Sequence, residues 1–163
     1  MRKLFTNKKA LTFILVLSMV FAMTAVSFAD TGDVTVTIKY QAYDQDTEVV
    51  TPLATQDVIT VDSGTSVKDA VDQALSGRTS SSALWISAGT DYYLEALTLD
   101  GTTYTNNGTS TPSVPGDWTH GTYEGTSWMY MVDGNYPDVY MSGYDLDEDA
   151  TVTLSFETMV YEW

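Results

Sequence analysis

The side chains in this sequence that are best suited to binding chemistry are aromatic, and most of them lie in or near residues 127–146. Tyrosine and tryptophan offer flat apolar area together with one polar group, which suits planar ligands, sugars or protein partners. The segment opens with large apolar residues and turns at Asp133-Gly134. The candidate ligand-binding residues are Trp118, Tyr123, Trp128, Tyr130, Tyr136, Tyr140 and Tyr144.

These aromatic residues have two competing explanations. Strand alternation puts Trp128 and Tyr130 on one face and Met129 on the other, so that one face must belong to the core. Because aromatic residues are enriched in strands generally, the core role is favoured for Trp128 and Tyr130. For the three tyrosines after the turn, which alternate with Pro, Gly and Asp, a binding surface and simple packing over the sheet edge stay equally open.

Catalysis has little support in the sequence. His120 is the one histidine, and a lone histidine in a Gly-Thr segment is typical of an exposed loop and cannot build a zinc site alone. The sequence contains no nucleophile elbow, phosphate loop or zinc-protease motif. No pair of its acidic residues is marked out for glycoside hydrolysis. We therefore predict a protein that is not an enzyme and that requires no cofactor.

A calcium site is also disfavoured. Asp145, Asp147 and Asp149 reproduce the opening of a calcium-binding loop, in which alternating carboxylates converge on the ion. However, Ala150 stands where the sharp turn needs glycine, and Phe156 stands where the last carboxylate belongs. We expect a solvated acidic turn here and no metal site.

The first residues have the pattern of a signal peptide, which we assign to residues 1–29. A basic head precedes the apolar run 10–25, and Ser27-Phe28-Ala29 offers small residues for cleavage before Asp30. The apolar run is shorter than the ~20 residues that a spanning helix needs. The prediction is a secreted, extracellular protein with no stable membrane span after cleavage.

Charge narrows the range of partners. Removing residues 1–29 leaves Lys39, Lys68 and Arg78 against 22 acidic residues, a formal net charge of 3 minus 22, or −19. Such a chain repels nucleic acid, because a phosphate backbone requires a basic patch, and the charge favours a soluble monomer. Cysteine is absent, so an exported domain must depend on its hydrophobic core rather than on disulfides.

Hydrophobic periodicity predicts a hairpin followed by one helix. Residues 33–43 alternate in the period-two pattern of a half-buried strand, and residues 56–61 form a second β-branched run. Residues 64–77 carry a single apolar stripe with helical spacing. Ser66 and Asp69 resemble a capping box at the start of this helix, and Gly77 is expected to end it in the left-handed conformation.

The second half predicts further strands. Residues 92–99 and 102–104 flank the tight turn Asp100-Gly101, and residues 127–132 and 150–156 form the last two predicted strands. We expect 105–125 to be a long surface loop. The apolar residues Leu84, Trp85 and Ile86 are expected to dock on the body.

One helix among strands, without repeated βα units, favours an α+β, β-grasp-like fold. It would have a mixed or antiparallel sheet packed on one helix, in a single domain spanning residues 30–163. The alternative is an all-β sandwich.

Two stretches resemble a known family. Residues 61–75, Val-Asp-Ser-Gly-Thr-Ser-Val-Lys-Asp-Ala-Val-Asp-Gln-Ala-Leu, are similar to the strand, Gly-Thr turn and helix of the transcobalamin-like C-terminal domain. Trp128-Met-Tyr-Met-Val-Asp-Gly and the aromatic residues after it resemble that domain's closing hairpin and loop. Asp133 departs from the family's Asn, and the segment before residue 150 lacks its Gly-Asp.

The resemblance implies a β-grasp-like domain of the kind secreted by Gram-positive bacteria. It also implies a small planar ligand, a corrinoid such as cobalamin, although the helical domain that helps transcobalamin hold its ligand has no counterpart in this sequence. The expected function is therefore non-catalytic capture of a small planar ligand by the aromatic hairpin and loop. The alternative is a protein- or glycan-interaction module at the cell envelope.

Overall fold

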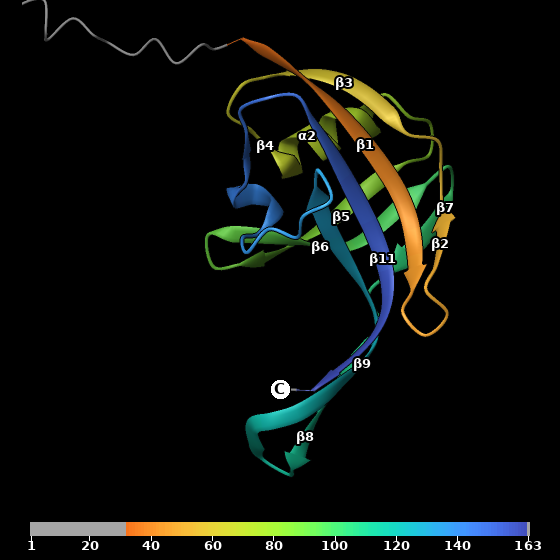
Figure 1. Ribbon diagram of the computed structural model, residues 1–163, viewed down its shortest axis with the longest axis vertical. Helices are drawn as coiled ribbons and strands as arrows, with labels where there is room; N and C mark the ends of the chain where they lie inside the picture. The colour runs from red at the N-terminus through yellow and green to blue at the C-terminus, as the bar shows by residue number, and fades with distance from the viewer. Residues whose placement is uncertain (1–31, 163) are drawn as a thin grey trace, which may run out of the picture. The chain divides into compact units, whose positions relative to one another are not determined.

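Two strands from opposite ends of the described chain lie side by side and parallel in the larger sheet (Figure 1). The computed structural model describes residues 32–162. Strand β1 (Asp33–Asp44) pairs with strand β11 (Ala150–Glu162), beginning at Val36 opposite Ala150. A parallel pair requires a long crossover, and here the entire intervening chain provides it.

The other strands complete two sheets and a short pair. The larger sheet also contains β2 (Val49–Pro52), β3 (Asp57–Asp62), β8 (Thr109–Val114) and β9 (Asp117–Val132). Its order is β2-β1-β11-β9-β8, with β3 also paired to β1. The second sheet is β5 (Ser82–Ala88), β6 (Asp91–Leu99) and β7 (Thr102–Thr105), and β4 (Thr65–Ser66) pairs with β10 (Asp145–Leu146).

Helix α2 (Val67–Ser76) begins where the sequence predicts its cap. The Ser66 side chain accepts a hydrogen bond of 3.1 Å from the backbone N–H of Asp69, which satisfies one of the free donors at the helix start. The apolar stripe is buried as expected, and its members are Val67, Ala70, Val71, Ala74 and Leu75. The prediction for Gly77 was wrong: its φ is −81°, so the helix ends without a left-handed residue.

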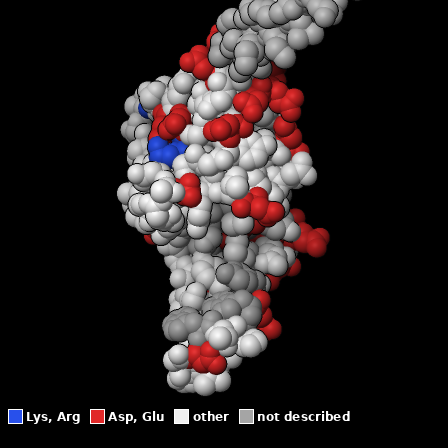
Figure 2. Space-filling view, turned by 90° about the vertical axis from the view of Figure 1, so that its left-hand side faces the viewer, with Lys and Arg blue, Asp and Glu red and all other residues white. Residues whose placement is uncertain are grey.

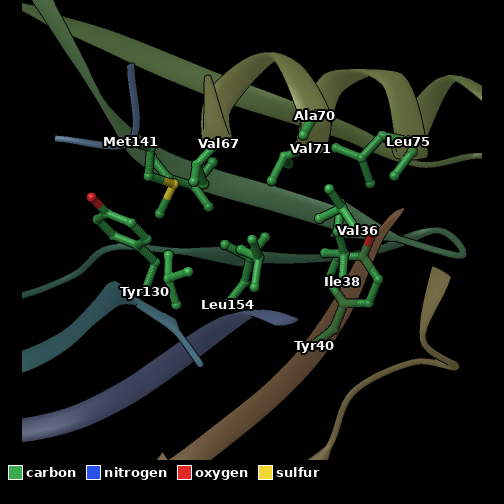
Figure 3. Close-up of a cluster of buried hydrophobic side chains, with 14 of the residues drawn as sticks. Val36, Ile38, Tyr40, Val67, Ala70, Val71, Leu75, Tyr130, Met141 and Leu154 are labelled. Atoms are coloured by element: carbon green, nitrogen blue, oxygen red, sulfur yellow. The ribbon is translucent and has the colours of Figure 1, made fainter. Parts of the chain in front are cut away.

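The core lies between the helix and one face of the larger sheet (Figure 3). Val36 and Ile38 of β1 and Leu154 of β11 are each fully buried, and they face the helix stripe. Burying a side chain of this size contributes about 1.5–3 kcal/mol. Tyr130 and Met141 close the end of the core near the start of α2. Mixed sheets packed on one helix make this the predicted α+β, β-grasp-like fold.

The predicted loop over residues 105–125 was wrong, because much of it forms β8 and the first half of β9. Asparagine, glycine and proline lower strand propensity in this segment, but the extended β11 gives β9 a partner out to Thr122, opposite Glu162. Pro112 is tolerated because β8 is an outer strand that needs no hydrogen bond on its free side. Pairing with a neighbouring strand has overridden local propensity.

The expectation for the apolar residues 84–86 was only partly right. They lie in β5, where Leu84 and Ile86 are exposed rather than docked. Trp85 is half-buried, and its Nε1 donates a hydrogen bond of 2.8 Å to Asp72 on the helix. Alternation along a strand explains the difference, since neighbouring side chains point to opposite faces.

Candidate functional site

A cavity of about 210 Å³ lies beside the second half of β9. Three segments that are distant in sequence form its walls: β9 itself, the start of β6 and the loop after the turn at residue 133. Its lining is almost entirely apolar and aromatic. The lining residues are Tyr93, Leu94, Trp128, Met129, Tyr130, Tyr136, Pro137, Val139, Tyr140 and Met141.

The β9 wall is rigid because Trp128 is held on several sides. Its Nε1 donates a hydrogen bond of 3.0 Å to the backbone carbonyl of Tyr104. Its ring packs edge-on against Tyr104, with centroids 6.3 Å apart, and at 5.1 Å from Phe156. Aromatic pairs in such arrangements each contribute about 0.5–1.5 kcal/mol beyond burial. Trp128 therefore presents a fixed apolar surface with its polar atom already used.

The loop wall is fastened to β9 at both ends. Asp133 and Gly134 take positive φ values of 49° and 81°, which gives the tight turn that the sequence predicts. Asn135 then pairs with Val132 through two backbone hydrogen bonds of 2.9 and 3.0 Å. Further along, the Tyr130 hydroxyl donates a hydrogen bond of 2.7 Å to the carbonyl of Val139. These hydrogen bonds fix both ends of the loop on β9.

Two tyrosines of the lining remain uncharged phenols over a wide pH range. Burial, and to a lesser degree Tyr144, raises the pKa of Tyr130 to about 12. Burial, followed by the hydrogen bond to Glu157, raises the pKa of Tyr136 to about 12. The Tyr136 hydroxyl lies 2.9 Å from Oε1 of Glu157, a carboxylate that is itself buried. Neither tyrosine can act as a base near neutral pH.

The edge of β9 that faces away from β11 is only partly occupied. The backbone N–H of Thr126 donates to Oδ1 of Asn107 at 2.9 Å, and that of Trp128 donates to Oδ1 of Asn106 at 2.8 Å. Closer to the turn, the backbone N–H of Val132 points to the same side and donates to the carbonyl of Asn135 at 2.9 Å. Within residues 32–162, three groups between them have no partner: the carbonyl of Trp128 and the N–H and carbonyl of Tyr130. We call these three groups the open edge.

The structure brings four of the seven candidate residues together. Trp128, Tyr130, Tyr136 and Tyr140 all line the cavity. Tyr144 lies behind it, where its ring meets that of Tyr130 edge-on at 6.5 Å.

The other two candidates lie elsewhere along β9. Tyr123 lies in the first half of the strand, where its hydroxyl is 2.6 Å from Oγ of Ser127. The side chain of Trp118 lies outside the described part of the structure.

The sequence did not identify the β6 wall. Tyr93 and Leu94 belong to a strand that was predicted correctly, but no local pattern shows that its start faces β9. Four further lining residues are apolar and lie between or beside the named aromatic residues in the sequence: Met129, Pro137, Val139 and Met141. Including the apolar neighbours of the aromatic residues would have identified them. The open edge has no sequence signal, because it depends on where distant asparagines bind.

Charged residues lie mostly away from the cavity. None of its lining residues carries a carboxylate, an imidazole or an amine. Figure 2 shows acidic side chains spread over the face that it presents, with little basic surface among them. Within residues 32–162, no three His, Cys, Asp or Glu side chains are placed to hold a metal ion. In the predicted acidic turn, Oδ1 of Asp149 instead accepts a hydrogen bond of 2.7 Å from the N–H of Thr35.

The arrangement can therefore hold a flat apolar group against rings from three segments of the chain. Within residues 32–162, no helix is long and apolar enough to cross a membrane. The proposed signal peptide, residues 1–29, lies outside the described residues.

Comparison of the sequence with models of known protein families finds no match. A comparison with curated protein sequences finds none either. The resemblance to the transcobalamin-like C-terminal domain stays a prediction, and the cavity must be interpreted from its own geometry.

Proposed function

We propose that this chain is a secreted, non-catalytic binding module that captures a small planar ligand in the cavity beside β9. The observation that carries the proposal is the lining itself, with rings from β6, β9 and the loop around a space free of ionisable groups at neutral pH. Concave sites lined mainly by apolar and aromatic side chains, with few polar atoms, are the usual form of a small-molecule site.

The volume limits what can be enclosed. Cavities for drug-sized ligands measure about 300–1,000 Å³, and the β9 cavity holds about 210 Å³. It can surround one ring system, whereas a complete corrinoid would have most of its macrocycle outside. If cobalamin is the ligand, as the family resemblance implies, one edge of it would enter. A smaller planar molecule fits the space better.

Secretion is part of the proposal and is supported by sequence. Residues 1–29 have the charge and apolar pattern of an export signal. A strongly acidic domain with a pre-formed cavity suits a binding protein of the cell envelope, where charge opposes self-association.

The proposal is tested by titrating purified protein with indole, naphthalene, cobinamide and cobalamin while following binding by calorimetry. Tyr140 is 47% exposed at the cavity, so Tyr140→Ala should preserve the fold and weaken binding about tenfold, which corresponds to roughly 1.4 kcal/mol of lost ring contact. Tyr92→Ala is the matched control, because Tyr92 is a similarly exposed tyrosine that packs near Lys68 rather than in the cavity. If no planar compound binds at tens of micromolar, or both variants weaken binding equally, the proposal fails.

The second candidate is a protein-interaction module at the envelope. The exposed rings of Tyr136 and Tyr140 favour it, because they are 52% and 47% exposed and aromatic side chains of this kind often contact protein partners. A double variant, Tyr136→Ala with Tyr140→Ala, should then lose capture of envelope material while circular dichroism stays unchanged. If that variant unfolds, the tyrosines serve the fold and neither candidate has a site.

A further inference from the structure

The open edge places hydrogen-bonding groups on a wall of an otherwise apolar cavity. Tyr130 is 8% exposed, and its N–H and carbonyl point away from β11, on the same side as the paired N–H groups of Trp128 and Val132. Leaving one buried backbone group unpaired costs about 1–3 kcal/mol. Buried backbone groups in folded proteins are almost always paired with protein, water or a ligand, so these groups are available to pair with a molecule that enters the cavity.

The occupied positions on either side limit the occupant to a single small ring system. Toward residue 126, the amide of Asn106 already fills the place that a neighbouring strand would take. Toward the turn, Asn135 fills it beside Val132. A strand added along this edge would have to displace both asparagines. A single flat molecule can enter between them without displacing either.

The open edge also specifies the polar pattern of that molecule. In an extended strand, the N–H and the carbonyl of one residue point to the same side. Tyr130 therefore offers a donor beside an acceptor, and the complementary ligand carries an acceptor beside a donor. A lactam or an amidine within an aromatic ring has this pattern on one edge, and the rest of the ring is apolar enough for the cavity walls.

Charge excludes phosphorylated versions of such rings. The lining holds no basic residue, and two acidic side chains lie close by: Glu157, bound to Tyr136, and Glu95, 3.2 Å from the Asn106 amide. A phosphate would meet these carboxylates without a compensating cation. A neutral or cationic heterocycle is therefore favoured over a nucleotide.

We infer that the cavity beside β9 binds a neutral or cationic planar heterocycle whose acceptor–donor edge pairs with the backbone N–H and carbonyl of Tyr130. The inference rests on the proposed function, because it uses the same cavity, and it adds the chemical class of the ligand. It makes the selectivity of the site depend on hydrogen bonds as well as on ring contact. A site built to pair a polar edge rejects analogues that lack it.

The test compares three probes that share a ring size: quinolin-2-one, 1-methylquinolin-2-one and naphthalene. Quinolin-2-one carries the acceptor–donor edge, the methylated compound lacks the donor, and naphthalene has neither group. Quinolin-2-one should bind the purified protein at least tenfold more tightly than the other two in calorimetric titrations. It should also shift the backbone amide resonance of Tyr130, whereas that of Met129, which faces β11, should move little.

The outcomes separate this inference from the proposed function. If all three probes bind equally and Tyr140→Ala weakens them all, the cavity binds planar rings, but the paired edge plays no part and the inference is wrong. If none binds, the proposed function fails first. If the capped peptide Val-Trp-Val binds more tightly than quinolin-2-one and protects the Tyr130 amide, the edge serves strand addition and the heterocycle is overturned.

Discussion

The two halves of strand β9 are stabilised in opposite ways. Residues 117–124 pair with β8 on one edge and, toward their end, with β11 on the other, yet described side chains such as Thr119, His120 and Glu124 are exposed. Residues 126–132 have a neighbouring strand, β11, on one edge only and scattered hydrogen bonds on the other, yet Trp128, Tyr130 and Val132 are all buried. Backbone pairing holds the first half, and side-chain burial holds the second.

The comparison shows why the cavity lies where it does. A half-strand that is fixed by burial can leave part of its edge unpaired without unfolding. Those unpaired groups are then available to a ligand. The first half could not do the same, because its pairing is the main interaction that orders it.

The largest expected difference between the halves is in stability. Trp128→Ala removes a buried ring that contacts Tyr104 and Phe156, and we expect it to lower the free energy of unfolding by about 3–5 kcal/mol. His120→Ala, an exposed change in the first half, should alter it by less than about 0.5 kcal/mol. Urea unfolding followed by circular dichroism measures both. If the two variants lower the free energy of unfolding by similar amounts, the two halves of β9 are not stabilised in different ways.

The junction between the halves depends on a close backbone approach. Gly125 has φ of +147°, and a Cβ there would collide with the backbone of Gly108 on the neighbouring segment. We expect Gly125→Ala to destabilise the first half by about 1–3 kcal/mol through this overpacking, in addition to the cost of a side chain at positive φ that it shares with Gly116→Ala. Native-state hydrogen exchange over residues 109–124 would detect the loss even if global unfolding did not.

Gly116→Ala is the control for that change. Gly116 also has a positive φ, +84°, but a Cβ there meets nothing within 4 Å. It should cost only the roughly 1–2 kcal/mol of a left-handed residue with a side chain. A control variant as disruptive as Gly125→Ala would show that backbone conformation, and not the contact with Gly108, is the cause.

A smaller loss of stability is expected from changing Asn106, which binds β9 next to the open edge. Asn106→Ala removes the acceptor for the Trp128 N–H and the amide donor to the carbonyl of Leu94. The expected loss in free energy of unfolding is about 1 kcal/mol for the bond to Trp128. The amide of Trp128 should then exchange with solvent faster than in the unmodified protein. Unchanged exchange at Trp128 would indicate that the asparagine does not occupy the edge.

The smallest effect is in alkaline solution. A tyrosine in the unfolded chain has a pKa of about 10, and Tyr130 and Tyr136 have values raised to about 12. Their contribution to stability is therefore complete below pH 10 and is lost as the pH rises toward 12, because only the unfolded chain releases the protons in that interval. Tyr136→Phe should remove one such titration from the tyrosinate absorbance. If Tyr130 and Tyr136 in native protein titrate with the pKa of about 10 of the unfolded chain, this assignment is wrong.

Much of the fold followed from local pattern. Alternation along residues 33–43 and the stripe from Val67 to Leu75 each identified a buried face correctly. An element that is buried on one face repeats its apolar residues with the period of its own secondary structure. Asp100-Gly101 and Asp133-Gly134 were predicted as turns and have the positive φ values that such turns require. The sequence also indicated that Trp128 and Tyr130 belong to the core.

The site could be predicted only in part. Tyr136 and Tyr140 were identified because exposed aromatic residues beside Pro and Gly are unusual in a loop. Tyr93 was missed because its contact with the cavity depends on how the second sheet packs on the first. The open edge could not be predicted, since it arises from the positions of Asn106 and Asn135 rather than from the residues of β9 itself.

Hydrogen exchange of the backbone amides of residues 126–132 in unliganded protein tests the central claim most directly. Among these residues, Tyr130 should exchange fastest, because its N–H has no partner within the described chain. Met129 and Met131 should be strongly protected by β11, and Val132 should be protected by Asn135. Adding quinolin-2-one should slow exchange at Tyr130 alone. If Tyr130 is as well protected as Met129 and Met131 before any ligand is added, the edge is not open and the account is wrong.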